Sequence, residues 1–292
     1  MGEALQAHLT VHRGKIVGEL ALLGRQARQL EGTGVRGGGP MSRRVAGPTA
    51  KLTVDDAGTG EAVLLVHSLA GNTGHWAGQL EHLRKTRRAV ALDLRGHGHS
   101  DPPKQGEYSI EAQSEDVGAV ADFLGLERFA VVGHSMGAGV ALAYAGAHPD
   151  RVTHLLLADP IGDGTQTPEA EVRPFLDALD SPGYTETIEG YWSSIAGSDG
   201  AVLDRLLRDL RATPRETMVR GLHAVMAFDP KPALARFRGP TLAVVTPEND
   251  FPYSMHRLGP GLPQRVITGT GHWLQIERPA EFNRILERFL QE

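Results

Sequence analysis

From residue 50 onward the chain alternates between short apolar runs and longer segments of mixed polarity. The runs are rich in Val, Leu and Ala and are bounded by turn-forming residues. They lie at 62–66, 89–92, 129–132, 152–157 and 242–245, with a weaker sixth at 265–267. Because apolar residues follow one another instead of alternating with polar ones, we expect strands that are covered on both faces. Such strands are typical of a largely parallel sheet.

Helix-like segments separate these runs, at about 109–125, 136–147 and 280–291. In the last of them Phe282, Leu286 and Phe289 recur at the spacing of one helical face. Pro279 stands where a first-turn proline is favoured. Strands that alternate with helices predict the α/β class, with a doubly wound sheet.

A block between the fourth and fifth runs, residues 161–236, has no strand-like stretch. It is predicted to contain helices at about 168–180, 186–195, 200–211 and 214–227. The block interrupts a core made of residues 49–160 and 237–292. An insertion at the carboxyl ends of parallel strands overlies the crevice where such sheets bind ligands. We therefore expect residues 161–236 to form a helical lid.

Residues 1–48 differ in composition and are predicted to be an N-terminal extension that is flexible or weakly helical. Five of the nine residues from Glu31 to Gly39 are glycine, which is typical of a linker. Residues 15–30 have the spacing of a short amphipathic helix. Charged side chains interrupt the apolar stretches, so the segment does not fit a signal peptide.

Composition narrows the classes of function. The 292 residues include 35 acidic and 30 basic side chains, so nucleic acid is not an expected partner. The chain has no cysteine, which excludes disulfides, thiolate metal sites and a cysteine nucleophile. No apolar run approaches the roughly 20 residues that span a membrane. We expect a cytoplasmic monomer or small homo-oligomer that acts on a small molecule.

The motif GHSMG at 133–137 is the first candidate for chemistry. It directly follows the apolar run 129–132 and opens a helix-like segment, which predicts a tight strand-to-helix turn. Such a turn raises the hydroxyl of Ser135 above the edge of the sheet, and its glycines let helix and strand approach closely. We therefore interpret Ser135 as a nucleophile.

A serine nucleophile needs a base, and the base needs a carboxylate that orients it. His272 lies in a late glycine-containing loop and satisfies the chain order Ser, acid, His. Asp250, a few residues after the run 242–245, is the predicted acid. Asp159, at the end of the preceding strand, is its main rival, and Glu248 is a weaker third candidate.

The oxyanion would be bound by two backbone N–H groups, one after the nucleophile and one from the loop that follows the first apolar run. By position these are Met136 and Leu69. Residues expected near the substrate are His134, Trp192, Leu222, Met226, Phe228 and Trp273, together with Tyr191.

The pair His97 and His99 in the stretch GHGHS could suggest a metal site, but no third ligand is identifiable. An HExxH arrangement is also absent. We expect neither a metal nor a cofactor.

Several stretches in succession resemble the α/β-hydrolase superfamily, in its lidded, esterase- and lactonase-like serine-hydrolase branch. They are LLVHSLAGNTGHW (64–76), VALDLRGHGHSDPP (90–103), VVGHSMGAGVALAYAGAHPDRV (131–152), VTPENDFP (245–252) and GTGHWLQIERPAEFN (269–283). The resemblance implies that fold, with a lid inserted after the strand that ends near Asp159. It also implies Ser135 as nucleophile, His272 as base and Asp250 as acid, with oxyanion donors at Met136 and Leu69.

Two departures from the family's pattern affect these assignments. Ser68 stands where glycine is common after the strand-end histidine, and some lactone-cleaving relatives carry a similar Ser-Leu pair. Pro247 stands where the acid loop commonly has glycine. A serine at the nucleophile position argues against the dehalogenases and epoxide hydrolases that use a carboxylate.

The sequence thus predicts a serine hydrolase that cleaves a small to medium carboxylic ester or a lactone through an acyl-enzyme. Two alternatives use the same triad: hydrolysis of a carbon–carbon bond, and cofactor-free perhydrolysis. A third, from a different class, is a ligand receptor or binding protein with slow or no turnover. A complete triad does not separate these alternatives, because the pocket decides among them.

Overall fold

A computed structural model describes residues 41–292, apart from residues 105 and 260. The expectations for residues 1–40 lie outside this range. Strand β1 begins at Met41 and pairs antiparallel with β2. The sheet therefore starts within the segment that was predicted to be an extension up to residue 48.

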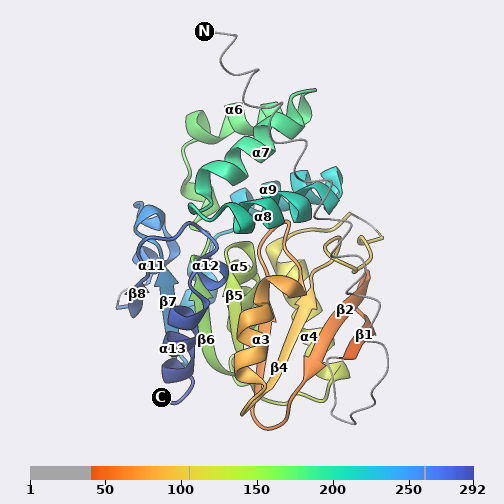
Figure 1. The fold of residues 1–292 in the computed structure, drawn as a ribbon, viewed down its shortest axis with the longest axis vertical. Helices are drawn as coiled ribbons and strands as arrows, with labels where there is room; N and C mark the ends of the chain where they lie inside the picture. The colour runs from red at the N-terminus through yellow and green to blue at the C-terminus, as the bar shows by residue number, and fades with distance from the viewer. Residues whose placement is uncertain (1–40, 105, 260) are drawn as a thin grey trace, which may run out of the picture. The chain divides into compact units, whose positions relative to one another are not determined.

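Within the described residues, eight strands form one sheet in the order β1-β2-β4-β3-β5-β6-β7-β8 (Figure 1). The strands are β1 (Met41–Ala46), β2 (Lys51–Ala57), β3 (Ala62–Val66), β4 (Arg88–Asp93), β5 (Phe129–His134), β6 (Val152–Ala158), β7 (Thr241–Val245) and β8 (Gln264–Val266). β1 and β2 join the sheet antiparallel, and all pairings from β4 through β3 to β8 are parallel. The predicted doubly wound α/β fold is confirmed.

Two hydrophobic cores explain the uninterrupted apolar runs. The helices that flank the sheet are α3 (Ala77–Leu83), α4 (Ile110–Phe123), α5 (Met136–Ala147) and α13 (Pro279–Phe289). Leu64 of β3 packs in one core with residues of α4 and α5, whereas its neighbours Val63 and Leu65 pack in the other with α3 and α13. Because successive side chains point to opposite faces, each central strand needs apolar residues at every position.

The predicted helices of the insertion between β6 and β7 are also confirmed, and Figure 1 shows α6 to α9 stacked beyond the ends of the central strands. The elements are η2 (Gly164–Gln166), α6 (Glu169–Asp180), α7 (Tyr184–Ile195), α8 (Gly200–Ala212), α9 (Arg215–Ala227) and α10 (Lys231–Arg236). Leu206 and Leu210 of α8 are buried in the same core as α5. In the described part of the chain, no helix is both long and apolar enough to cross a membrane.

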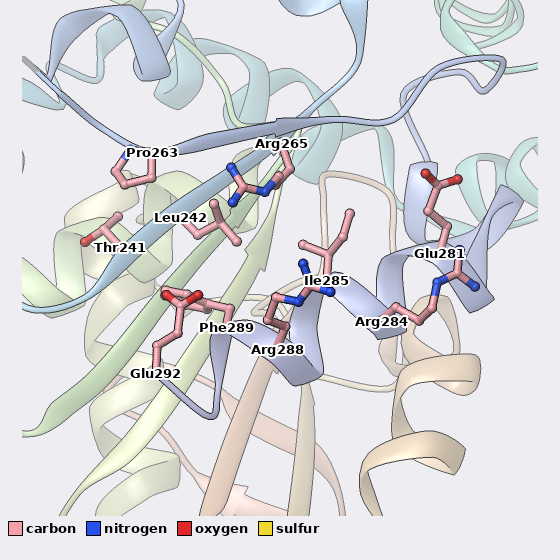
Figure 2. A pocket seen from close by; sticks show the side chains of 10 residues that line it. All are labelled: Thr241, Leu242, Pro263, Arg265, Glu281, Arg284, Ile285, Arg288, Phe289 and Glu292. Carbon is pink, nitrogen blue, oxygen red and sulfur yellow. The ribbon is translucent and has the colours of Figure 1, made fainter.

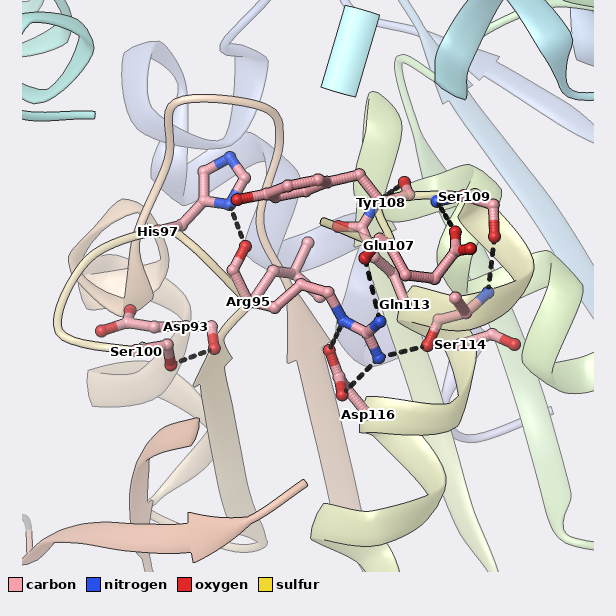
Figure 3. Close-up of polar contacts among 12 residues, drawn as sticks. Asp93, Arg95, His97, Ser100, Glu107, Tyr108, Ser109, Gln113, Ser114 and Asp116 are labelled. Atoms are coloured by element: carbon pink, nitrogen blue, oxygen red, sulfur yellow. Dashed lines mark hydrogen bonds and ion pairs between the residues drawn. The ribbon is translucent and has the colours of Figure 1, made fainter. Parts of the chain in front are cut away.

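A buried ion pair fixes the loop after β4 to α4 (Figure 3). The guanidinium of Arg95 donates to both carboxylate oxygens of Asp116, at 2.7 and 2.8 Å, and both side chains are almost fully buried. Two further N–H groups of the guanidinium donate to the carbonyls of Glu107 (3.1 Å) and Ala112 (2.6 Å). The buried charges are thus paired and hydrogen-bonded, as burial requires.

Two buried histidines support neighbouring loops. His67 Nδ1 donates to the carbonyl of Ser68 (2.7 Å), and its Nε2 accepts from the amide of Leu94 (2.9 Å). His97 Nδ1 lies 3.0 Å from the carbonyl of Arg95, to which it donates. Burial lowers the pKa of each ring to about 3. Both therefore act as neutral hydrogen-bonding groups near pH 7.

Asp116→Ala should lower the free energy of unfolding by about 3–5 kcal/mol, because it leaves the Arg95 guanidinium buried without its partner. Urea denaturation followed by circular dichroism measures this. Asp177→Ala is the control, because it removes a solvent-exposed pair with Arg173 and should change stability little. Equal effects of the two substitutions would contradict the structural role of the buried pair.

His97→Asn should reduce the slope with which the free energy of unfolding falls toward acid pH. Below about pH 6.5 the unfolded chain binds a proton at residue 97, whereas the folded ring resists protonation down to about pH 3. Stability therefore falls as the pH falls through this window, by up to about 1.4 kcal/mol per pH unit for each such ring. Urea titrations at pH 6.5, 5.5 and 4.5 should show a slope reduced by that amount. A slope equal to that of the wild type would contradict this contribution of His97.

Candidate active site

Ser135 occupies a strained turn between β5 and α5. Its backbone has φ 54° and ψ −117°, a conformation that is costly for a residue with a side chain. The amide of Ser135 donates to the carbonyl of Ala158 on the neighbouring strand (2.9 Å). A Cβ at Gly137 would overlap the carbonyls of Val66 and His67. The glycine thus permits the close approach of helix and strand that holds the serine in place.

Backbone strain is concentrated around this turn. The described residues other than glycine with positive φ are Ala70 (56°), Ser135 (54°) and Asp159 (38°). They follow β3, β5 and β6, which are adjacent parallel strands, so all three lie at the carboxyl edge of the sheet. Such conformations cluster at functional sites, and they point to this edge.

His272 approaches the same edge from the loop between β8 and α12 (Leu274–Glu277). Its Nδ1 lies 2.6 Å from Asp159 Oδ2. Donation of the Nδ1 proton to this carboxylate leaves Nε2 free to accept a proton. The ring is about one-fifth exposed, and it lines a cavity of about 510 Å³ together with Ser135 and Asp159.

The side chain of Asp159 is held by several donors and is only 2% exposed. Besides His272, its oxygens accept from the amide of Thr246 (2.8 Å), from the Thr246 hydroxyl (3.0 Å) and from Asn249 Nδ2 (3.2 Å). Asn249 also donates to the carbonyl of Pro160 (2.9 Å). The loop after β7 therefore supplies groups that orient a carboxylate of the preceding strand.

Asp250, the predicted acid, does not contact His272, so this prediction is wrong as to geometry. Asp250 Oδ2 accepts from Arg257 Nη2 at 2.6 Å, and its Oδ1 accepts from Arg257 Nε and lies 3.3 Å from His256 Nε2. The hydrogen bonds from Arg257 lower the pKa of Asp250 to about 2. The rival Asp159 contacts the histidine instead. Glu248, the third candidate, is exposed at the rim of the cavity.

The predicted oxyanion donors lie beside Ser135. Met136 is the first residue of α5, where backbone N–H groups have no intrahelical acceptor and the helix dipole favours negative charge. Leu69 lies in the turn closed by the bond from the Gly71 amide to the Ser68 carbonyl (2.9 Å). These residues, Ser135 and His272 line a further cavity of about 80 Å³.

Ser68 adds a polar group to this small cavity. Its side chain is 2% exposed, and its hydroxyl has no hydrogen-bond partner within the residues that the structure describes. In sequence Ser68 was notable only as a departure from a family pattern. Thr246 and Asn249 were missed altogether, because a threonine and an asparagine near a strand end are ordinary turn residues.

The predicted pocket residues divide into two groups. Trp192, Leu222, Met226 and Trp273 line the small cavity, together with Tyr191. Phe228 and His134 line neither cavity: Phe228 is buried in the hydrophobic core, and His134 has no exposed surface.

His134, the last residue of β5, contacts His272, the candidate base, from the side of the sheet. Its Nε2 donates to the carbonyl of His272 (2.8 Å), and the two rings lie 4.8 Å apart between centroids. Burial lowers the pKa of His134 well below its usual value. A neutral His134 thus fixes the backbone of the His272 loop.

Another pocket, of about 280 Å³, lies near the start of β7 and the end of α13 (Figure 2). Arg265, Arg284 and Arg288 line it with Glu281 and Glu292. Because parallel strands begin at the edge opposite to the one where they end, this pocket is on the other edge from Ser135. Among the described residues, no group of three or more His, Cys, Asp or Glu side chains is arranged to hold a metal ion.

Comparison with known proteins agrees with this architecture. A family model described as the α/β hydrolase fold matches residues 61–184. RutD of Caulobacter segnis, a protein named for carbamate hydrolysis, is 30% identical over 251 residues, which cover 79% of this chain and 91% of RutD. The 2-hydroxymuconate semialdehyde hydrolase of Pseudomonas putida is 29% identical over 288 residues, covering 86% of this chain and 95% of that enzyme.

A solved structure described as an N-acyl homoserine lactone degrading enzyme superposes with a TM-score of 0.73 at 28% identity, covering 85% of this chain and all of that one. The chain spans only 64% of the length of another relative, the dihydrolipoyllysine-residue acetyltransferase component of an acetoin cleaving system of Cupriavidus necator, at 29% identity. The fold, the matching family model and these relatives agree: the chain belongs to the α/β hydrolase family and is related to its hydrolases.

Proposed function

We propose that this protein is a serine hydrolase that cleaves a carboxylic ester or a lactone through an acyl-enzyme, with Ser135 as nucleophile, His272 as base and Asp159 as acid. The observation that carries the proposal is the 2.6 Å contact between His272 Nδ1 and the buried Asp159, in a cavity that Ser135 also lines. Nucleophile, base and orienting carboxylate are recognised by such geometry and not by their positions in sequence.

In the proposed reaction, each of the three side chains acts through a particular atom. His272 Nε2 takes the proton of the Ser135 hydroxyl as its oxygen attacks the substrate carbonyl, and it then delivers that proton to the leaving alcohol. Asp159 keeps the Nδ1 proton in place and stabilises the imidazolium that forms. Water, activated by the same histidine, then hydrolyses the acyl-enzyme and regenerates Ser135.

The negative charge of the tetrahedral intermediate would be bound by the backbone N–H groups of Met136 and Leu69. The fixed turn after β3 and the start of α5 support these roles, because both hold their amides in place before substrate arrives. The hydroxyl of Ser68, which lines the same small cavity, offers a third donor.

The shape of the cavities supports a substrate of small to medium size. The larger space, about 510 Å³, lies beneath residues of α7 and α9, so the insertion acts as a lid in this proposal. Aromatic and aliphatic side chains predominate near Ser135, which favours an apolar acyl or alcohol group. The similarity to a lactone-degrading enzyme supports the same choice.

Hydrolysis of a carbon–carbon bond is the second candidate, favoured by the similarity to a semialdehyde hydrolase over nearly its whole length. That reaction would use the same three side chains. A vinylogous diketone, the substrate of carbon–carbon hydrolysis, would need polar groups in the pocket that a simple ester does not need. Substrate assays therefore separate the two candidates.

Ser135→Ala should lower the hydrolysis of p-nitrophenyl acetate, butyrate and octanoate by about 10⁴-fold or more, because no other group replaces the nucleophile. Circular dichroism and thermal melting verify that the variant is folded. Ser193→Ala, at an exposed serine of α7 that bonds to the Glu189 carbonyl, should change the rate less than about twofold. Unchanged activity of Ser135→Ala would refute the nucleophile. A folded wild type that is inactive on all three esters would refute ester hydrolysis and favour carbon–carbon cleavage.

Asp159→Asn and Asp250→Asn distinguish the two candidate acids. Asp159→Asn should lower kcat by about 10⁴-fold, because an amide favours the wrong tautomer of His272. Asp250→Asn should leave kcat within about threefold, since this side chain bonds to Arg257 outside the cavity. Steady-state kinetics on the preferred p-nitrophenyl ester measures both. The reverse order of effects would restore Asp250 as the acid.

A further inference from the structure

The carboxylate of Glu277 joins two segments that are far apart in sequence. Glu277 is the last residue of α12, five residues after His272. Its Oε2 accepts from the amide of Gly271 (3.0 Å), and its Oε1 accepts from the amide of Gly197 (3.3 Å). Gly271 precedes His272, and Gly197 lies just beyond α7 in the helical insertion. One side chain thus bridges the loop of the candidate base and the insertion.

The two bridged segments are also in direct backbone contact. The amide of His272 donates to the carbonyl of Ile195, the last residue of α7 (2.8 Å). A Cβ at Gly271 would overlap the backbone of residues 195–197, and a Cβ at Gly197 would overlap the Glu277 carboxylate. Glycine at both positions is therefore what allows the two backbones to touch.

These contacts place the insertion among the groups that hold His272. The ring of His272 is held by Asp159 and its carbonyl by His134, both from the sheet side. Its amide is held by Ile195 from the insertion. The same helix, α7, presents Tyr191 and Trp192 to the cavities that Ser135 lines. A movement of α7 would therefore alter the cavity and remove a support of the base together.

We propose that Glu277 is a positioning residue that couples closure of the helical insertion to the orientation of His272. This inference rests on the proposed function, because it requires His272 to be the base. With both amides bound to the carboxylate, the imidazole is held in line with Asp159. When residues 195–197 withdraw, His272 loses the Ile195 acceptor and Glu277 loses its bond to the Gly197 amide, so the loop of His272 is no longer tied to the insertion and the alignment of its ring with Ser135 is lost.

A carboxylate suits this role better than an amide. Both oxygens of Glu277 accept, so each can receive one of two converging N–H groups. A glutamine has one accepting oxygen and would direct its NH₂ group at the other amide. Glu277→Gln should therefore lose one bond of the bridge, and Glu277→Ala should lose both.

The test measures kcat and KM of Glu277→Ala and Glu277→Gln on the preferred p-nitrophenyl ester. We expect kcat to fall about 10- to 100-fold in the alanine variant and less in the glutamine variant, because displacements of about 1 Å at a catalytic group have effects of this size. KM should change by less than about threefold. The acid limb of the kcat/KM profile should move to lower pH, because a displaced Asp159 contact stabilises the imidazolium less.

Glu281→Gln is the matched control, since Glu281 is the next glutamate along the chain and lines the pocket along α13 (Figure 2), not the cavities that Ser135 lines. It should leave kcat and the pH profile unchanged. A kcat of Glu277→Ala equal to that of Glu281→Gln would overturn the proposal. A loss confined to KM would do the same, because it would indicate substrate binding and not alignment of the base.

Gly197→Ala tests the bridge without changing the carboxylate. Its methyl group would occupy the place of the Glu277 carboxylate and crowd the Gly271 amide, so we expect the same loss of kcat, and the double variant with Glu277→Ala should lose little more. Gly200→Ala is the control, because no atom lies within 4 Å of a Cβ placed there. Additive losses in the double variant would show that the two residues act separately and would contradict the bridge.

Amide hydrogen exchange gives a readout independent of activity. In Glu277→Ala the amides of Gly197 and Gly271 should exchange faster together, and in Glu281→Gln neither should change. Unchanged exchange at either glycine would overturn the coupling. If Ser135→Ala remains active, the proposed function fails. If Ser135→Ala is inactive but Glu277→Ala behaves as its control, only the coupling fails.

Discussion

The hydrogen bonds received by Asp159 form the interaction on which the geometry of the site depends. A buried carboxylate is costly unless donors surround it, and here they come from Thr246, Asn249 and His272. These donors lie on the loops after β7 and β8. Asp159 has a left-handed backbone conformation, which directs its carboxylate toward these three donors. The loops are therefore held to one arrangement, because displacement of either leaves the carboxylate short of partners.

Ser135 and His272, the proposed nucleophile and base, are held by different parts of the fold. Ser135 is fixed by the sheet and by the tight turn into α5. This turn requires glycine at position 137, because a Cβ there would overlap the backbone at the end of β3. His272 lies on a longer loop, and one of its supports, Ile195, belongs to the helical insertion. In the proposed coupling, movement of residues 195–197 therefore acts on His272 and not on the strand-to-helix turn that holds Ser135. Conformational control would then fall on the proton transfer and not on the attacking oxygen.

Local patterns predicted the features that depend on local structure. The apolar runs, Ser135 and His272 could be located because a buried strand, a strained turn and a glycine-containing loop each leave a signal in sequence. β1 and β2 were missed, since β2 reads KLTVDDA and its aspartates gain partners only in the fold, where Asp56 pairs with Arg88. The sequence favoured Asp250 over Asp159 as the partner of His272, because both satisfy the same chain order and their contacts are set only in the fold. Only the packing of β6 beside β7, and the pairing of Asp250 with Arg257, distinguishes them.

A buried histidine makes the loops beside the site sensitive to acid pH. The neutral ring of His67 links the Ser68 carbonyl to the Leu94 amide, and burial lowers its pKa to about 3. A proton on this ring removes the acceptor at Nε2 and introduces an unpaired buried charge. The turn that carries Leu69 then loses its anchor, so acid near pH 3 should disturb the backbone at the place where we propose that the oxyanion binds.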